Sequence, residues 1–509
     1  MKNIKYFFIA SLLTLSLSSC NDWLTILPDN EQITDQFWSS KEDVEGVLAN
    51  GYVSLRSCAE SMLLWGEARG NALSPMWSTT GELYADAYKL SIFTVMPSDG
   101  LVSWANYYKV INMANSVLHY TDGIEDNSFK PEERSSYKAE AYFLRALAYF
   151  YLVRNFKEVP FVTEPYITDA QPYDMAKSDE ATILNSILAD LYENLQYAKE
   201  VFDETDPLNP IYTKGRATRW AMYALIADIN LWMGNYDACI TACQSIKDGG
   251  RIGLIRPDSE NNTAEVQKEI WFSNFYPGNS NESIFEVQYS NSLSQTSIYL
   301  EFFSTNSWLA ASRHTMTEVF PLSTQELDVR YNLSISNRRI WKYIGNNSIG
   351  GTRSSTQNDQ NWIVYRMADI YLMMAEALIM KGNTDNYSTA VTEWINPVRN
   401  RVGLANATAT SNELDMLKLV LYERKREFIG EGKTWYDILR VAKRNEFQYH
   451  QFLVEETLKG DMATAGLAGV ITSIINDTNA LYLPIAQSEI NNNKLLVQNK
   501  YYEAFGNSN

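Results

Sequence analysis

Apolar residues recur at helical spacing over much of the chain. In residues 138–156, Phe143, Leu147 and Phe150 fall on one helical stripe, and nearly every other side of the segment is apolar as well. An all-round apolar pattern predicts a helix buried among other helices rather than one lying on a surface. The helix should end near Pro160, because proline cannot continue the hydrogen-bond ladder.

Two later segments share one order of residues: small residues, then glycine, then tyrosine and alanine. They run from Ala224 through Gly234 to Tyr236 and Ala238, and from Ala375 through Gly382 to Tyr387 and Ala390. The order is similar to the tetratricopeptide helix-turn-helix, in which alanine permits close packing and glycine ends the first helix. We therefore predict a mostly α fold, with a tetratricopeptide-like scaffold of helical pairs interrupted by long irregular loop and short-strand excursions.

The excursions are visible as polar segments without a helical stripe. Residues 71–103 and 261–314 are rich in Ser, Asn, Thr and Gly, with aromatic residues interleaved. Residues 283–289 alternate between apolar and polar, which predicts a strand, and residues 345–361 form a Gly/Asn/Ser loop. Loops on a rigid scaffold are the usual place for binding surfaces.

The amino terminus has the pattern of a secretory signal. Lys2 and Lys5 precede an apolar run at residues 6–17, which is shorter than the about 20 residues that a membrane-spanning helix needs. The following Leu17-Ser18-Ser19-Cys20 resembles a bacterial lipobox; the alternative is a plain signal peptide with an incidental cysteine. We predict a signal peptide at residues 1–19, acylation of Cys20, and a single body at residues 20–509 that is anchored to the membrane rather than spanning it.

Composition is that of a globular protein, with 45% hydrophobic and 20% charged residues. The formal net charge is −18, and no Lys/Arg-rich stretch is present. Binding of phosphate groups needs compensating basic charge, so nucleic acid and anionic lipid headgroups are poor partners.

Cysteine and histidine do not form a recognisable reactive site. Cys239 and Cys243 share a helix face, but no neighbouring His or Cys completes a zinc site, so we predict that they are small core residues. The chain has only three histidines: His119, His314 and His450. None accompanies a GxSxG, HExxH or CxxC motif. We predict neither a metal site nor a cofactor.

The most enzyme-like pattern is a row of carboxylates at Glu423, Glu427 and Glu431. Residues four apart on a helix have Cβ atoms about 5–6 Å apart, close to the separation of the acid pair in a retaining glycosidase. The alternative is a structural ion network with the basic residues 424–426, which we favour because catalytic pairs usually come from separate elements. We interpret two more charged pairs as locks between helices: Glu140 with Arg145, and Arg366 with Asp369.

Aromatic residues in polar loops are the candidate ligand contacts. Trp77 and Trp308 lie in polar loop sequence without helical spacing, and Tyr299 and Phe303 precede Trp308 closely. An aromatic ring can cover the apolar face of a sugar while its polar neighbours bind hydroxyl groups. We predict that these four residues bind ligand; the alternative is that they pin the loops to the scaffold. Trp104 is at helical spacing from its aromatic neighbours, and we assign it to the core.

Five stretches, in order along the chain, resemble the SusD/RagB family of nutrient-binding outer-membrane lipoproteins. They are CNDWL at 20–24, AEAYFLRA at 139–146 with the later Val159-Pro160, YRMADI at 365–370 with AEA at 375–377, ERKREFIGEG at 423–432 with DILR at 437–440, and LPI at 483–485 with EI at 489–490 and QN at 498–499. Lys500 departs from the family pattern, in which proline and glycine often precede the last tyrosine.

The resemblance implies a non-enzymatic protein on the outer face of the outer membrane. Such a protein delivers oligosaccharides, or peptides in some members, to a partner SusC-like TonB-dependent transporter. We expect the helical repeats at about residues 20–260 and the ligand loops at about residues 261–509. A peptide-binding member of the family and a lipid-anchored α-helical glycoside hydrolase are the alternatives.

Overall fold

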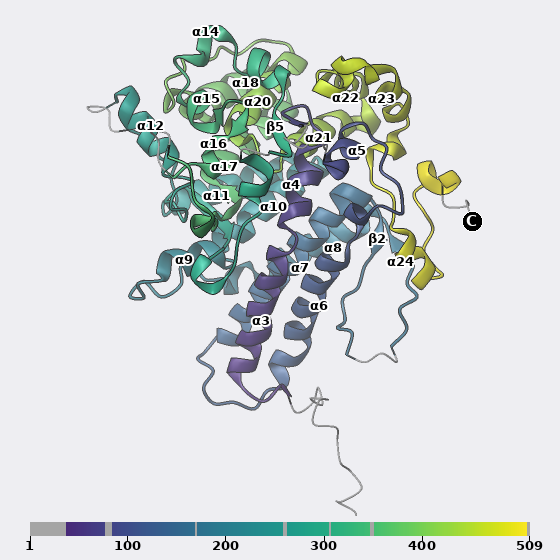
Figure 1. The fold of residues 1–509 in the computed structure, drawn as a ribbon. Coiled ribbons are helices and arrows are strands. Elements are labelled where there is room, and N and C mark those ends of the chain that lie inside the picture. The colour runs from purple at the N-terminus through teal and green to yellow at the C-terminus, as the bar shows by residue number, and fades with distance from the viewer. Residues whose placement is uncertain are drawn as a thin grey trace, which may run out of the picture.

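The computed structural model describes residues 37–76, 84–167, 171–257, 262–304, 307–346 and 351–505. The predicted signal peptide, Cys20 and Trp77 lie outside these ranges. The described chain is mainly helical, as predicted, and its strands form short two-stranded pairs (Figure 1).

Long helices of the amino-terminal part lie side by side (Figure 1). They are α3 (Lys41–Arg56), α6 (Ala105–Tyr120), α7 (Glu133–Phe156) and α8 (Glu180–Asn194). Helix α3 begins at a capping box, in which Ser40 and Asp43 each bind the backbone of the other. Helix α7 contains the predicted segment 138–156, and its residues Phe143, Leu147 and Phe150 have no exposed surface. The prediction of a buried helix there is confirmed.

Both predicted helical pairs are present. Helix α10 (Arg219–Met233) meets α11 (Tyr236–Gly249) at Gly234, and α17 (Met367–Lys381) meets α18 (Thr384–Thr389) at Gly382. The two glycines have φ values of 81° and 77°, which residues with a side chain rarely adopt. Helix α11 packs on α17, so the second pair stacks on the first. The second pair continues through the π-helix η8 (Ala390–Ile395) and α19 (Asn396–Asn400).

The excursions are less irregular than predicted. Strand β4 (Ser283–Val287) confirms the predicted strand, although all five of its residues are buried where it pairs with β8 (Trp362–Arg366). The segments also contain short helices: α5 (Ala85–Ser91), α12 (Ala264–Phe272) and α13 (Tyr299–Phe303). Helix α12 begins at Thr263, whose side chain accepts a hydrogen bond from the backbone N–H of Val266. The prediction that residues 261–314 contain no helix is therefore wrong.

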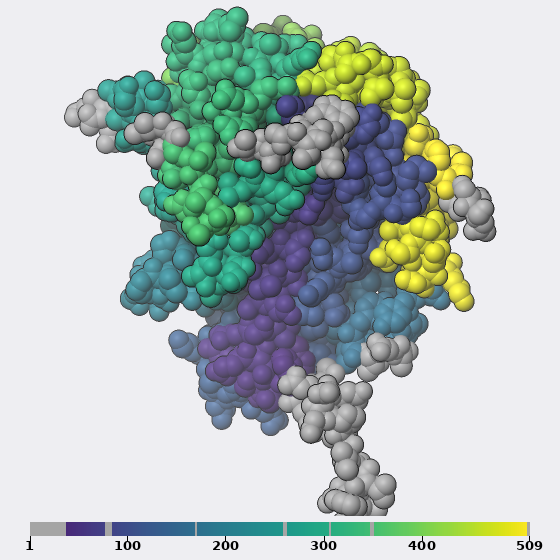
Figure 2. All heavy atoms as spheres, viewed as in Figure 1, coloured from purple at the N-terminus to yellow at the C-terminus, as the bar shows by residue number. Residues whose placement is uncertain are grey.

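The carboxyl-terminal helices close the fold against early segments of the chain. They are α20 (Glu413–Phe428), α21 (Thr434–Phe447), α22 (His450–Thr457), α23 (Ala468–Ile475) and α24 (Gln487–Asn492). Figure 2 shows these late residues, in yellow, directly beside the early residues in dark blue. Helix α21 packs against α4 (Ala59–Glu67), and Arg69 donates a hydrogen bond to the carbonyl oxygen of Leu481 at 3.1 Å. One continuous hydrophobic core includes residues from both parts of the chain.

Shorter elements complete the described chain. They include β1 (Leu73–Pro75), β2 (Val159–Pro160), β3 (Lys177–Ser178), η4 (Leu195–Tyr197), α9 (Asn209–Gly215), β5 (Leu309–Ala311), α14 (Leu322–Gln325), α15 (Val329–Ser334), β6 (Ile335–Ser336), β7 (Arg339–Ile340), α16 (Trp341–Ile344) and η11 (Lys500–Phe505). Trp104 is buried, as predicted, and so are the free cysteines Cys58, Cys239 and Cys243. None of the described helices is both long and apolar enough to cross a membrane.

Candidate ligand-binding surface

The two excursions meet in a short antiparallel ladder. Strand β1 pairs with β5, so that Leu73 lies opposite Ala311 and Pro75 opposite Leu309. Just beyond the strands, the backbone N–H of Met76 donates to the carbonyl oxygen of Trp308 at 3.0 Å. This pairing brings the two segments together and places Trp308 next to Met76, the residue that precedes Trp77 in sequence.

Trp308 is half-buried and belongs to a small aromatic cluster. The ring centroid of Tyr84 lies 5.4 Å from that of Trp308, with 42° between the planes, and 5.4 Å from that of Phe302 in an edge-to-face contact. The Tyr84 hydroxyl donates to the Glu60 carboxylate at 2.8 Å. Burial, with this hydrogen bond and nearby acids, raises the pKa of Tyr84, so the phenol stays neutral. The cluster thus combines aromatic surface with polar groups at its edge.

Tyr299 and Phe303 lie beneath this surface rather than on it. Their exposed fractions are 1% and 0%. The Tyr299 ring stacks on Tyr343 of α16, with centroids 4.1 Å apart and planes 2° apart, and lies parallel to Trp362 of β8 at 5.7 Å. Both residues lie on one face of α13, four positions apart, and that face points into the core. Neither ring offers a face to a ligand in this structure, so the prediction is corrected: these residues support the surface.

The charged groups around Tyr84 are acidic. Three nearby carboxylates raise the pKa of the Tyr84 phenol by electrostatic repulsion: those of Glu60, Asp86 and Glu301. Glu301 is exposed on the outer side of α13. A ligand at this surface therefore meets aromatic carbon, hydroxyl and carboxylate groups, an environment that suits a neutral polyol better than an anion.

The predicted carboxylate row is a buried ion network and offers no open acid pair. Glu423 and Glu427 lie on α20, whereas Glu431 follows the end of this helix, so the three do not share one helix face. Glu423 Oε1 lies 2.7 Å from Arg330 Nη1, and Glu423 Oε2 lies 2.9 Å from Arg399 Nη1. Glu427 is bound by Arg330, Arg366 and Arg401, and Glu431 by Lys342 and Arg366. All three carboxylates are inaccessible to solvent. Their contacts confirm a structural ion network but correct its predicted partners. Arg426 binds Glu423 at 3.1 Å, whereas Arg424 pairs with Asp369 and Asp437, and Lys425 pairs with Glu456.

Electrostatics keep the central carboxylate of this network ionised. Burial by itself would raise the pKa of Glu427, but the guanidinium groups of Arg401, Arg366 and Arg330 outweigh it and lower the pKa to about 2. A general acid needs a pKa near the working pH. Glu427 is therefore poorly suited to catalysis as well as inaccessible.

The two other predicted charged pairs lock helices, but with different partners. Glu140 of α7 accepts bonds from Arg216 at 2.9 and 2.6 Å, and Arg145 binds Asp190 of α8 at 2.8 Å. Asp369 of α17 binds Arg424 at 2.8 Å rather than Arg366. The residues were correctly identified as structural, whereas their partners are distant in sequence and could not be identified from spacing.

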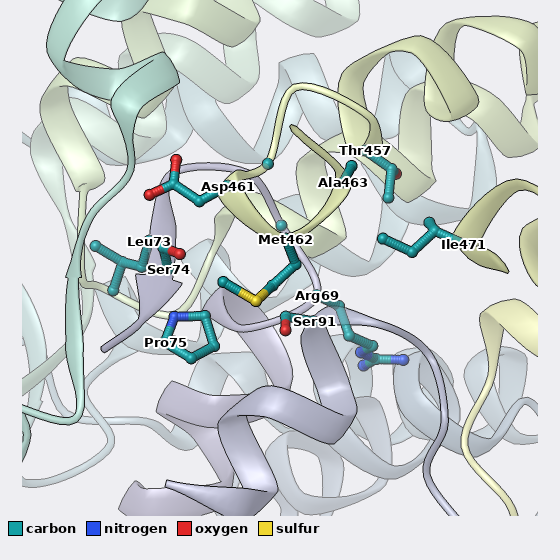
Figure 3. Close-up of a pocket in the computed structure, with 12 residues that line it drawn as sticks. Arg69, Leu73, Ser74, Pro75, Ser91, Thr457, Asp461, Met462, Ala463 and Ile471 are labelled. Atoms are coloured by element: carbon teal, nitrogen blue, oxygen red, sulfur yellow. The ribbon is translucent and has the colours of Figure 1, made fainter. Parts of the chain in front are cut away.

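A small pocket next to β1 is too small to hold a sugar. It lies between β1 and the segment that joins α22 to α23, and Met462 extends toward Pro75 and Ser91 (Figure 3). Its volume is about 10 Å³, which is room for about one water molecule. The described residues also contain no cluster of three or more His, Cys, Asp or Glu side chains suited to a metal ion.

Two family models match the chain. A model described as the SusD family matches residues 289–502, and one described as "Starch-binding associating with outer membrane" matches residues 22–231. The chain belongs to the SusD/RagB family. The two matched ranges include β1 and β5, so both strands of the ladder lie in sequence that the SusD models recognise.

Individual SusD relatives match over most of their length. SusD-like protein P2 of Formosa agariphila is 26% identical over 495 residues, which cover 88% of this chain and 92% of that protein. Among solved structures, a SusD superfamily protein of Bacteroides fragilis is 18% identical with a TM-score of 0.73, covering 92% of this chain and all of the other. A structure described as a laminarin binding SusD-like protein is 20% identical with a TM-score of 0.65, covering 91% and 99%. The structural matches establish the SusD fold.

Proposed function

We propose that this protein binds an oligosaccharide at the surface formed by Trp308 and Tyr84 and delivers it to a SusC-like TonB-dependent outer-membrane transporter. The observation that carries the proposal is the β1–β5 ladder, which joins two aromatic-rich loop segments and holds Trp308 at a partly open position. Membership of the SusD family supports it, as does the similarity to a protein described as laminarin binding.

Binding at this surface relies on aromatic contact and peripheral hydrogen bonds. The accessible part of the Trp308 indole packs against the C–H face of a sugar ring, while the hydroxyl groups reach the polar edge of the surface, which includes Glu60. The stack of Tyr299 on Tyr343 beneath α13 keeps the surface rigid, so little conformational entropy is lost when the ligand binds.

The proposal assigns no chemical step to the protein. The carboxylates most similar to a glycosidase pair are buried and occupied by arginine and lysine. Attachment to the membrane would come from acylation of Cys20, since no described helix could span the bilayer. This anchor and the transporter partner are parts of the proposal.

Incubation of the purified mature protein with a panel of neutral polysaccharides tests the function. Depletion of one polymer from solution without new reducing ends supports binding alone. New reducing ends would identify a hydrolase instead. Retention of an unrelated peptide pool, with no polysaccharide retained, would identify the peptide-binding alternative.

A further inference from the structure

A second cavity lies apart from the Trp308 surface. It is bounded by α9, the start of α10 and the segment before β4, and its volume is about 190 Å³. Helix α9 lies at the edge of the molecule in Figure 1. None of its lining residues belongs to β1, β5, α5 or α13. The volume suits one sugar unit rather than an oligosaccharide.

Lys214 is the key group in the wall of this cavity. Its ammonium group donates to the carbonyl oxygen of Ser283, and no carboxylate in the described part of the chain lies within 4 Å of it. An ammonium group carries three N–H donors, so two remain for a ligand. The carboxylate of Glu286 raises the pKa of Lys214 from a greater distance. This carboxylate accepts a hydrogen bond from Asn361 Nδ2 at 2.7 Å. Burial lowers the pKa of Lys214 to about 8, which leaves it mainly charged at neutral pH.

The other charged groups in the lining are paired. The lining contains two cations, Lys214 and Arg251, and one carboxylate, Glu200. Glu200 is bound by Arg219 at 2.7 Å and by Arg251 at 3.4 Å, and Arg251 is also bound by Glu204 at 3.0 Å. Lys214 is therefore the charged group of this lining that has no ion-pair partner among the described residues, and it favours a ligand with a negative group.

The uncharged lining suits a sugar ring. Asn281 is exposed and Thr213 half-buried, and they contribute an amide and a hydroxyl group to the lining. The Thr213 hydroxyl accepts a hydrogen bond from the Phe202 N–H at 3.1 Å, so its own O–H remains available as a donor. Trp220 and Ile252 add apolar surface. Trp220 is 7% exposed, and its Nε1 has no hydrogen-bond partner among the described residues, which leaves one buried donor in the wall unsatisfied.

We propose that this cavity binds one acidic sugar unit, a hexuronate, with the carboxylate on Lys214 and the ring hydroxyls on Asn281 and Thr213. The site is separate from the neutral-glycan surface and does not require it. Acidic residues surround Tyr84 at the Trp308 surface, whereas Lys214 is a cation, so the two sites favour ligands of different charge.

Isothermal titration with sodium glucuronate tests the proposal, with the methyl ester of glucuronic acid as the matched neutral ligand. We expect the ester to bind at least tenfold more weakly, and Lys214→Gln to weaken glucuronate binding at least tenfold. Asn281→Ala, at an exposed position with no effect expected on folding, should weaken it severalfold. Lys500→Gln removes the same charge on η11 and should leave the affinity unchanged.

Three results would overturn the assignment. They are equal affinity for glucuronate and its ester, unchanged affinity in Lys214→Gln with an unchanged melting temperature, and acetate binding as tight as glucuronate. Trp308→Ala serves as the cross-control. If Trp308→Ala loses neutral-glycan binding but still binds glucuronate, the two sites are independent. Failure of one proposal can then be distinguished from failure of the other.

Discussion

Arg330 Nη1 lies 2.7 Å from Glu423 Oε1, and both side chains are completely buried. The same guanidinium group binds Glu427 at 2.8 Å and Asp328 at 2.8 Å. Arg330 belongs to α15 and Glu423 to α20, so the ion network joins two helices that are far apart in sequence. Charges removed from water in this way stabilise a fold only while every partner is present.

Glu427→Gln should lower the free energy of unfolding by about 3–5 kcal/mol, because it removes one of the two buried carboxylates that Arg366 and Arg401 share and leaves them with Glu282 alone in common. Affinity for the glycan should be unchanged. Chemical denaturation and titration calorimetry measure the two quantities. The exposed Glu265→Gln on α12 is the charge-matched control and should leave stability unchanged within about 0.5 kcal/mol. Loss of a hydrolytic activity at unchanged stability would argue for catalysis instead.

Acid should destabilise the protein between about pH 4.5 and pH 2. Burial raises the pKa of Glu456, but Lys425 and Lys459 outweigh it and lower the value to about 2, as the arginines do for Glu427. A folded-state pKa below the unfolded value of 4.5 contributes stability that is complete above pH 4.5 and is lost as the pH falls toward 2. Urea denaturation at pH 7, 5, 4 and 3 should show a steepening loss. A constant midpoint from pH 5 to pH 3 would contradict the network's role.

Gly66→Ala should be strongly destabilising because a Cβ atom at this position would lie 2.0 Å from the carbonyl oxygen of Gly432. Helix α4 and the turn before α21 would have to separate, and overpacking of this kind costs typically about 1–3 kcal/mol. Gly46→Ala in α3 is the matched control, since nothing lies within 4 Å of its new methyl group. Thermal melts should show a loss for the first variant and a small gain for the second. Equal melting temperatures would refute the close contact.

Trp308→Ala and Trp77→Ala should each weaken glycan binding roughly tenfold, which corresponds to about 1.4 kcal/mol. The fold should change little, because Trp308 is only partly buried at the edge of the core and Trp77 is predicted to lie on a polar loop. Titration calorimetry with the cognate glycan and thermal melts separate the two effects. Tyr197→Ala removes another exposed ring, on η4, and should leave affinity unchanged. Unchanged affinity in both tryptophan variants, or a melting loss of core size, would mean that they anchor loops.

Cys20→Ala should release the protein from the membrane fraction or leave it unprocessed, because acylation of this cysteine is the proposed anchor. Fractionation of cells followed by a salt wash provides the measurement. Cys58→Ala, at a buried cysteine of the body, is the control and should remain in the membrane fraction. Salt-resistant membrane retention of the Cys20 variant would rule out the lipobox.

The sequence predicted the parts of this fold that depend on local pattern. The all-round apolar stripe of α7 and the glycine turns at Gly234 and Gly382 are visible in any window of about 20 residues, and each is present as predicted. The role of Glu423 could also be inferred, because the basic residues that follow it indicated an ion network. Its main partner Arg330, in contrast, lies on another helix and gives no local signal.

The candidate site was predicted less well, for a physical reason. Tyr299 and Phe303 were assigned to the ligand surface because their loop is polar, yet α13 has only five residues and too little sequence for a periodic stripe. The side of α13 that is buried is determined by the packing of Tyr299 and Phe303 on Tyr343, which is distant in sequence. A spacing of four between two aromatic residues was the one available signal of a helical face.

Because synthesis starts at the amino terminus, the β1–β5 ladder can form only some time after β1 has been made. Residues 73–75 are made early and have no strand partner until residues 309–311 follow. An unpaired strand can pair with another chain and cause aggregation. Strand β1 is only three residues long and ends in proline, which lacks an N–H donor, so aggregation through β1 is limited before β5 has been made. A fragment that stops before residue 309 can form the α10–α11 pair but lacks the ladder that positions the ligand surface. Glycan capture at the proposed surface would therefore require that synthesis has passed residue 311.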